Sequence, residues 1–494
     1  MRQLQIFILF LFLMQGFFYG VAQEKEADGT DYTMYRLKTS GSLSSGGQTP
    51  FWLTGNRYGI VPLAANNGYL QAGLFHRQPL GHGWEWQAGL DMVAATPRYR
   101  KVYVQQIFGT LAYRWIHLNI GSRGDADYYR SMLDYRLSSG DMGLSTNSRP
   151  IPEINLYIPH FVTLPFTGGW LHGKGNFAVG RSFDTDYLRS FARANQTCVK
   201  NVLWHNKSLY LNVKDTRNDF PVSMTLGIQH IAQWGGISTD PRLGVQPHAL
   251  SDFLRIIFGK AGDSNASLSD QINALGAHYG TYDFRLNYAK QNWAVSAYYQ
   301  HLFSDASGIE FKNGWDGLKG VQLDLPTFPW LHKAVIEYVT TLHQSGPFHF
   351  IEFDHDKYPG MGGGGDNYYN NGEYTTGASY FNRGLGSPLL LSPEYNTNGT
   401  PGFNHTRIRA WHLGTEGNLT EALSYRLMVS AIESFGKPYA PTPKKLTDIS
   451  FTMDFRYLFR NSWSLSASLA ADRGSLLDNQ SGFSVSIAKW GWIR

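Results

Sequence analysis

Apolar and polar residues alternate along most of this chain. In the segment WEWQAGLDM (84–92), every second residue from Trp84 to Met92 is apolar, and the residues between them are polar or glycine. Because successive side chains of a β-strand point to opposite faces, this pattern predicts strands with one apolar and one polar face. The same period recurs in VSMTLGIQH (222–230), TYDFRLNYAK (281–290), SYRLMVSA (424–431), ISFTMDFRYLF (449–459) and SWSLSASLAAD (462–472).

The composition favours a membrane barrel over a soluble β-protein. Charged residues make up 16% of the chain and aromatic residues 15%, and there are 53 glycines. The apolar faces often begin or end in Trp, Tyr or Phe, as lipid-interface girdles require, and the polar faces suit a wet lumen. A soluble sandwich also has alternating strands, and a propeller would show a repeat of roughly 40–50 residues, which we do not find. The sequence therefore predicts an all-β fold, a transmembrane antiparallel β-barrel.

The N-terminus is typical of an export signal. Arg2 precedes an apolar run, and the small residues Gly20 and Ala22 mark a cleavage site. We expect residues 1–22 to be a signal peptide and residues 23–494 a single outer-membrane β-barrel domain.

The length sets the expected number of strands. Allowing roughly 26 residues for each strand with its share of turn and loop gives about 18 strands, an even number as in bacterial barrels. Within the mature chain, residues 23–50 are the candidate periplasmic lead-in.

Charge and cysteine content exclude other classes. The formal net charge is +5 without a basic cluster, so we expect no nucleic-acid partner. Cys198 is the single cysteine, which rules out an internal disulfide framework. The expected location is the cell outer membrane, with outer-membrane lipid and the outer-membrane assembly machinery as partners.

A glycine-rich stretch, DHDKYPGMGGGGDNYYNN (354–371), contains a G-x-G-x-x-G match. A dinucleotide loop needs a strand before and a helix after it. Here the strand-like AVIEYVTTL and FHFIEF precede the stretch and no helical period follows, so we predict no cofactor. The alternatives for its acidic residues are a Ca²⁺ site and a solvated loop, and we assign no metal. The acidic and histidine residues concerned are Asp354, His355, Asp356 and Asp366.

Two other functions remain open on the residues alone. In HQSG (343–346), His343 and Ser345 share one side of a strand, as a base and a nucleophile of an outer-membrane hydrolase would. The chain lacks H-E-x-x-H and G-x-S-x-G motifs, and we expect no enzyme activity. A diffusion porin is the other alternative.

Several long blocks span most of residues 200–420: HNKSLYLNV, GIQHIAQWGG, HLFSDASGIEFKNGWDGLKGVQL, EYVTTLHQSGP, DNYYNNGEYTTGASYFNRGLGSPL and NHTRIRAWHLGTEGNL. These blocks resemble the Bacteroidetes branch of the capsule assembly Wzi family, and FWLTGNRYGIV (51–61) adds a looser match. The resemblance implies an outer-membrane barrel with 18 strands that retains capsular polysaccharide at the cell surface by lectin-like binding.

Given that role, residues 354–377 become the candidate saccharide-binding segment. We expect an extracellular loop or one folded back into the lumen. Aromatic faces stack on sugar rings, and Asp and Asn side chains orient hydroxyl groups. The alternative is that the aromatic residues pack the segment shut and plug the pore. The predicted saccharide-binding residues are Asp366, Asn367, Tyr368, Tyr369, Asn371 and Tyr374.

Overall fold

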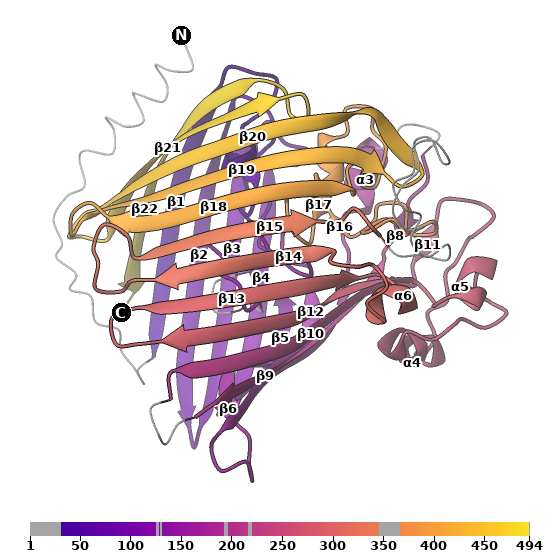
Figure 1. Cartoon of the computed structure of the whole chain (residues 1–494), viewed down its shortest axis with the longest axis horizontal. Helices are drawn as coiled ribbons and strands as arrows, with labels where there is room; N and C mark the ends of the chain where they lie inside the picture. Colours follow the sequence, from indigo (N-terminus) through magenta and orange to yellow (C-terminus); the bar gives the residue numbers. More distant parts are fainter. Residues whose placement is uncertain are drawn as a thin grey trace.

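The computed structural model is dominated by one β-sheet that closes on itself (Figure 1). Eighteen strands form this sheet, and neighbouring strands are antiparallel throughout. The barrel closes between its first and last strands, in a register that runs from Thr33 opposite Ile493 to Ser44 opposite Gly482. The predicted fold class and strand number are confirmed. The structure describes residues 31–124, 128, 131–191, 196–215, 220–344 and 366–493.

Most wall strands are long enough to cross a bilayer, which takes about 9–11 residues per strand, whereas β5, β14 and β15 have 7, 8 and 8 residues. Each predicted alternating segment falls in a wall strand, to within one residue at its end. In chain order the strands are β1 (Tyr32–Ser44), β2 (Asn67–Gly81), β3 (Trp84–Thr96), β4 (Val102–Tyr113), β5 (Ile116–Ser122), β6 (Glu153–Thr163), β7 (Leu171–Arg181), β9 (Leu203–Lys214), β10 (Val222–Trp234), β12 (Ala277–Ala289), β13 (Ala294–Phe303), β14 (Gly317–Asp324), β15 (Lys333–Thr340), β18 (Ile408–Asn418), β19 (Leu423–Lys437), β20 (Ala440–Leu458), β21 (Trp463–Gly474) and β22 (Gln480–Ile493).

The two ends of the barrel differ. Short turns join strands at the end where β1 begins and β22 ends, which is the periplasmic end in bacterial barrels, and the long connections gather at the opposite, extracellular end (Figure 1). The long connections contain α2 (Phe51–Thr54), α3 (Thr185–Phe191), α4 (Leu250–Phe258), α5 (Leu268–Ile272), α6 (Ala306–Ile309), η3 (Pro393–Tyr395), and the small pairs β8 (Val199–Lys200) with β11 (Ile237–Ser238) and β16 (Ser379–Tyr380) with β17 (Arg383–Gly384).

The two faces of the wall separate by polarity, as the alternation predicts. On β20, Ser450 and Thr452 are buried inside the barrel, whereas Ile449 is exposed on the outside. On β3, Asp91 is buried inside and Leu90 is exposed. Large apolar side chains on the outer face suit contact with acyl chains, and a polar inner face suits a lumen. Among the described residues, no helix is long and apolar enough to cross a membrane.

The N-terminal part of the mature chain corrects one expectation. Residues 23–50 were the candidate periplasmic lead-in, but Tyr32–Ser44 form β1 and pair with β2 and β22. A closed barrel leaves no strand edge unpaired, and β1 supplies the partner that both of its neighbours need. Residues 1–22, the predicted signal peptide, lie outside the described residues.

Candidate functional site inside the barrel

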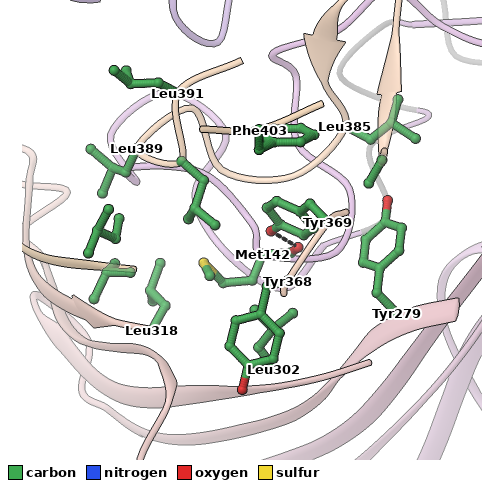
Figure 2. Close-up of a cluster of buried hydrophobic side chains, with 14 of the residues drawn as sticks. Met142, Tyr279, Leu302, Leu318, Tyr368, Tyr369, Leu385, Leu389, Leu391 and Phe403 are labelled. Carbon is green, nitrogen blue, oxygen red and sulfur yellow. Dashed lines mark hydrogen bonds between the residues drawn. The ribbon is translucent and has the colours of Figure 1, made fainter. Parts of the chain in front are cut away.

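Chain segments that fold inward fill the lumen, from the extracellular end down to Asp134, which pairs with Lys333 at the periplasmic end of β15. We call residues 131–152 and 366–407 together the plug; they connect β5 to β6 and β15 to β18. Figure 2 shows Met142, Tyr368 and Phe403 of the plug in the same buried cluster as Leu302 and Leu318 of the wall. Apolar side chains from the plug and from the strand ends thus form one core inside the barrel.

The wall holds the first plug segment through buried polar side chains. Glu337 of β15 accepts hydrogen bonds from the amide of Ser139 at 2.7 Å and from its hydroxyl at 2.5 Å. The Asp141 carboxyl group accepts from Gln229 of β10 at 3.0 Å and from Gln300 of β13 at 2.8 Å. Burial raises the pKa of Asp141. A buried polar group costs free energy unless it is paired, so these contacts define one position for the segment.

Helix α2 also enters the lumen and is hydrogen-bonded to the barrel wall. The amide of Phe51 donates to Asp472 of β21 at 2.9 Å, and the indole N–H of Trp52 donates to Ser430 of β19 at 3.1 Å. Both rings are buried in the same core as the plug. The FWLT sequence at 51–54 therefore fixes the β1–β2 connection inside the barrel.

The predicted site residue Tyr368 lies in the plug and is buried. Its hydroxyl donates to Asp316 at 3.2 Å and accepts from Asn313 at 2.7 Å, and its amide donates to Gln344 at 3.1 Å. Burial raises the pKa of Asp316 to about 7. The ring is surrounded by protein, so it has no free face for a sugar in this structure.

Tyr369 and Tyr374 are buried in the same way. The Tyr369 hydroxyl donates to the carbonyl of Met142, the dashed contact in Figure 2. The Tyr374 hydroxyl donates to the carbonyl of Gly235 at 3.2 Å. The structure brings the three predicted tyrosines together on one segment, where they pack the lumen as the alternative interpretation expected. Stacking of a sugar on these rings would require the segment to leave the plug.

The polar members of the predicted set are partly accessible. Asn367 accepts hydrogen bonds from Thr406 and from Asn370, each at 2.9 Å. Asn371 accepts from the amide of Tyr374 at 3.0 Å. Burial, together with the neighbouring Asp305 carboxylate, raises the pKa of Asp366 to about 8. Whether these side chains bind a saccharide stays a prediction.

The other candidates fall mostly outside the described residues. These include Ser345, Asp354, His355 and Asp356, the G-x-G-x-x-G match and the strand-like FHFIEF segment. Within the described ranges, no cluster of three or more His, Cys, Asp or Glu side chains is placed to hold a metal ion.

A cavity of about 120 Å³ lies between the plug and the wall. Its lining combines aromatic rings with charged groups, and none of these residues is among the predicted saccharide-binding residues. Among its lining residues, those that give it this character are Tyr58, Tyr128, Arg123, Arg149, Glu153 and Trp204.

The charged groups of the cavity are held in place by neighbours. The Tyr128 hydroxyl donates to Glu153 at 2.7 Å. The Arg123 guanidinium donates to Gln87 at 3.0 Å and lies 5.6 Å from the centre of the Tyr128 ring. A ring face, a fixed guanidinium and a carboxyl group therefore meet on one side of the cavity.

Trp204 supplies a hydrogen-bond donor in the same cavity. Its side chain is buried, and its indole N–H has no hydrogen-bond partner among the residues that the structure describes. Buried donors are usually paired with protein, water or a ligand. Trp204 shares the inner face of β9 with Asn206, Ser208 and Tyr210, and because Tyr210 is a packed ring on the same face, the sequence pattern does not distinguish Trp204 from it.

Comparison with known proteins establishes the fold. A scan against protein-family models finds no matching family, and a search of curated proteins finds no matching relative. Among solved structures, the chain is similar to Wzi, an outer-membrane protein involved in group 1 capsule assembly in Escherichia coli and described as a carbohydrate-binding β-barrel. That match has a TM-score of 0.54 and 14% identity, and it covers 92% of this chain and 83% of Wzi.

Two solved structures from Pseudomonas aeruginosa are also similar. OccK5 (OpdH) has a TM-score of 0.46 and 8% identity, covering 94% of this chain and 99% of its own. OprD has a TM-score of 0.43 and 10% identity, covering 96% of this chain and 99% of its own. With its closed sheet and apolar outer face, the chain is an outer-membrane β-barrel.

Proposed function

We propose that this barrel assembles or retains capsular polysaccharide at the cell surface by non-covalent, lectin-like binding. The observation that carries the proposal is the cavity between plug and wall, where the Trp204 N–H, the Tyr128 ring and the Arg123 guanidinium come together. Aromatic faces with a few fixed polar groups are what sugar recognition needs. The resemblance of the 200–420 blocks to the Bacteroidetes branch of the capsule assembly family supports the same assignment.

Residues 366–377 of the predicted saccharide-binding segment also take part in the proposed binding. Asp366, Asn367 and Asn371 are partly accessible and are proposed as polar contacts to the polysaccharide. Tyr368, Tyr369 and Tyr374 are buried and hold the segment in place. Binding by the segment would then depend on the plug being folded, even though the rings themselves do not touch the sugar.

The two rival functions, a diffusion porin and a Ser/His hydrolase, require different structural features of the barrel. A diffusion porin needs a continuous open lumen, and the plug core around Met142 and Tyr369 occupies the extracellular half. A Ser/His hydrolase would need His343 beside Ser345, and Ser345 lies outside the described residues. The hydrolase predicts ester cleavage that disappears in Ser345→Ala. The porin predicts a large conductance of the wild-type protein in a planar bilayer.

The first test is the partition of capsular polysaccharide between cells and medium, with and without the gene. We expect deletion to release polysaccharide into the medium while total synthesis is unchanged. An unchanged partition of polysaccharide would contradict the proposal, and the conductance and esterase assays would then be the next experiments.

The second test addresses the cavity directly. Trp204→Phe keeps an aromatic ring and removes the indole donor, so binding of purified capsular polysaccharide to the barrel should weaken by about 1 kcal/mol, roughly fivefold. Trp411→Phe is the matched control, because Trp411 is exposed on the outer face of β18. Equal affinities of the two variants for the polysaccharide would remove Trp204 from the site.

A further inference from the structure

An unusual set of polar residues faces outward near the extracellular end of the wall. On β9, Tyr210 points into the lumen and donates to Asp283, so Trp204 and Asn206 share its side of the strand and His205 and Lys207 point out. On β10 and β12, Gln229 and Tyr279 face the lumen, which places His230 and His278 on the outside. The His230 and His278 rings contact each other through Nε2 and Nδ1 at 2.9 Å.

Lipid would be a poor environment for these side chains. Imidazole and ammonium groups in contact with acyl chains would lack hydrogen-bond partners, which is costly. The outer face therefore needs a cover at this height.

Helix α4 provides that cover. Phe253 packs on the outward-facing Phe177 and His205, with ring centroids 6.4 and 5.5 Å apart, and stacks on Trp234 at 5.2 Å. The carbonyl of Ile257 accepts a hydrogen bond from the Lys207 ammonium group. The helix thus lies against the outside of the barrel, on β7, β9 and β10, and not over the lumen.

The opposite face of α4 is also apolar. Leu250, Leu254 and Phe258 are 76%, 50% and 69% exposed and recur at every fourth position, so they form one row along the helix. The following helix, α5, exposes Leu268 and Ile272 in the same manner. A helix that is apolar on both faces is expected where both faces are buried, in protein on one side and in another apolar phase on the other.

We propose that α4 and α5 form an interfacial lipid anchor, with their exposed apolar row inserted into the outer leaflet of the membrane that surrounds the barrel. The occupant is lipid with acyl chains and an anionic headgroup. The helix replaces a polar stretch of wall by an apolar surface, so the lipid-facing belt continues around the barrel at this height.

Two further observations support lipid as the occupant. The apolar belt lies directly below α4 on the same strands, where Leu209 of β9 and Leu226 of β10 are exposed on the outer face. The basic residue Lys260 follows the helix, and its ammonium group lies 6.0 Å from the centre of the Phe258 ring. A cation beside an inserted ring is suited to an anionic headgroup.

The test is spin-label accessibility in lipid nanodiscs that contain phosphatidylglycerol. Cys198→Ser removes the single native cysteine, and Leu254→Cys then carries the label. Leu209→Cys, on the outer wall, reports a lipid-exposed site, and Ser264→Cys, in the exposed loop between α4 and α5, reports a water-exposed site. Phe258→Cys is a second reporter on α4. Oxygen concentrates in the acyl-chain region, and a polar nickel chelate stays in water.

We expect the labels at 254 and 258 to collide more often with oxygen than with the chelate, as at 209, and the label at 264 to show the opposite preference. A chelate preference at 254 and 258 equal to that at 264 would overturn the proposal. Low accessibility to both reagents, together with a dimeric mass, would overturn it in favour of a second copy of the chain. The outcome is independent of polysaccharide binding.

Discussion

Glu337 of the barrel wall and Ser139 of the plug, 198 residues apart in sequence, are joined by two hydrogen bonds to one carboxyl oxygen. The other oxygen of Glu337 accepts from the Tyr298 hydroxyl at 2.7 Å. All three residues are buried. The wall strand β15 thus holds the plug from inside the barrel, and the barrel cannot be treated as an empty pore with loose loops.

Replacing Glu337 by Ala should loosen the plug. The change leaves the Ser139 amide and hydroxyl buried without an acceptor, at a cost of about 2–4 kcal/mol. We expect a larger and noisier single-channel conductance in a planar bilayer than for the wild-type barrel. Glu433→Ala is the control, since Glu433 pairs with Lys445 at 2.6 Å in a more exposed position. Identical conductance of Glu337→Ala and wild type would show that this contact does not hold the plug.

The ring and the hydroxyl group of a plug tyrosine contribute separately to stability, and substitutions can distinguish the two contributions. Tyr369→Phe keeps the buried ring and removes the hydrogen bond to Met142, so we expect a loss of about 1 kcal/mol in the free energy of unfolding and little change in polysaccharide affinity. The double change of Tyr368 and Tyr369 to Ala leaves large cavities, at about 3–5 kcal/mol for each ring. It should weaken binding through loss of the plug.

Urea unfolding in lipid vesicles and binding of capsular polysaccharide check this pair of variants. A Tyr369→Phe barrel that is as stable as wild type but binds the polysaccharide poorly would contradict the packing role and point to a direct contact with the sugar.

Asp366 should make the plug sensitive to pH. Its folded-state pKa, raised from 3.8 to about 8 by burial and then by Asp305, means that the folded segment holds this proton more tightly than the unfolded chain does. Stability of the segment therefore falls as pH rises from about 4 to about 8, and it levels off above that. Amide-exchange protection of residues 366–377, corrected for intrinsic rates, should decrease over this range. The variant Asp366→Asn should lose the dependence, and the same slope in both proteins would rule out Asp366 as its source.

The free-energy cost of an arginine on the outer wall should depend on its depth in the bilayer. Leu226 is exposed near the middle of β10, so Leu226→Arg places a guanidinium among acyl chains and should cost roughly 2–4 kcal/mol. Leu419 lies in the short turn between β18 and β19, where the same change should cost about 0–1 kcal/mol. The free energies of unfolding in lipid vesicles give the comparison. Equal losses at the two positions would mean that the outer face of β10 does not contact lipid.

The strands of the barrel wall can be predicted from local sequence patterns alone. The alternation of Trp84, Trp86 and Leu90 with Glu85 and Asp91 is a local property of one strand. The face on which a side chain lies depends only on whether its position along the strand is odd or even. Strand length and chain length then limited the number of strands to about 18, and the structure has that number. The same logic did not identify β1 as a wall strand, because its sequence YTMYRLKTSGSLS alternates weakly and its place depends on pairing with β22 at the other end of the chain.

The segments that fill the barrel, in contrast, are identified only by their contacts in the folded protein. The segment from Asp366 to Tyr374 has the composition of a sugar-binding loop and also that of a packed core, and no local pattern separates the two. Its position depends on distant partners: Tyr369 on Met142, Tyr368 on Asp316, and Asn367 on Thr406. Likewise, α4 carries an apolar sequence whose two faces are assigned only when the wall beneath it is in place. Strand patterning is set by neighbours in sequence, whereas burial of a loop is set by contacts that exist only after the sheet has closed.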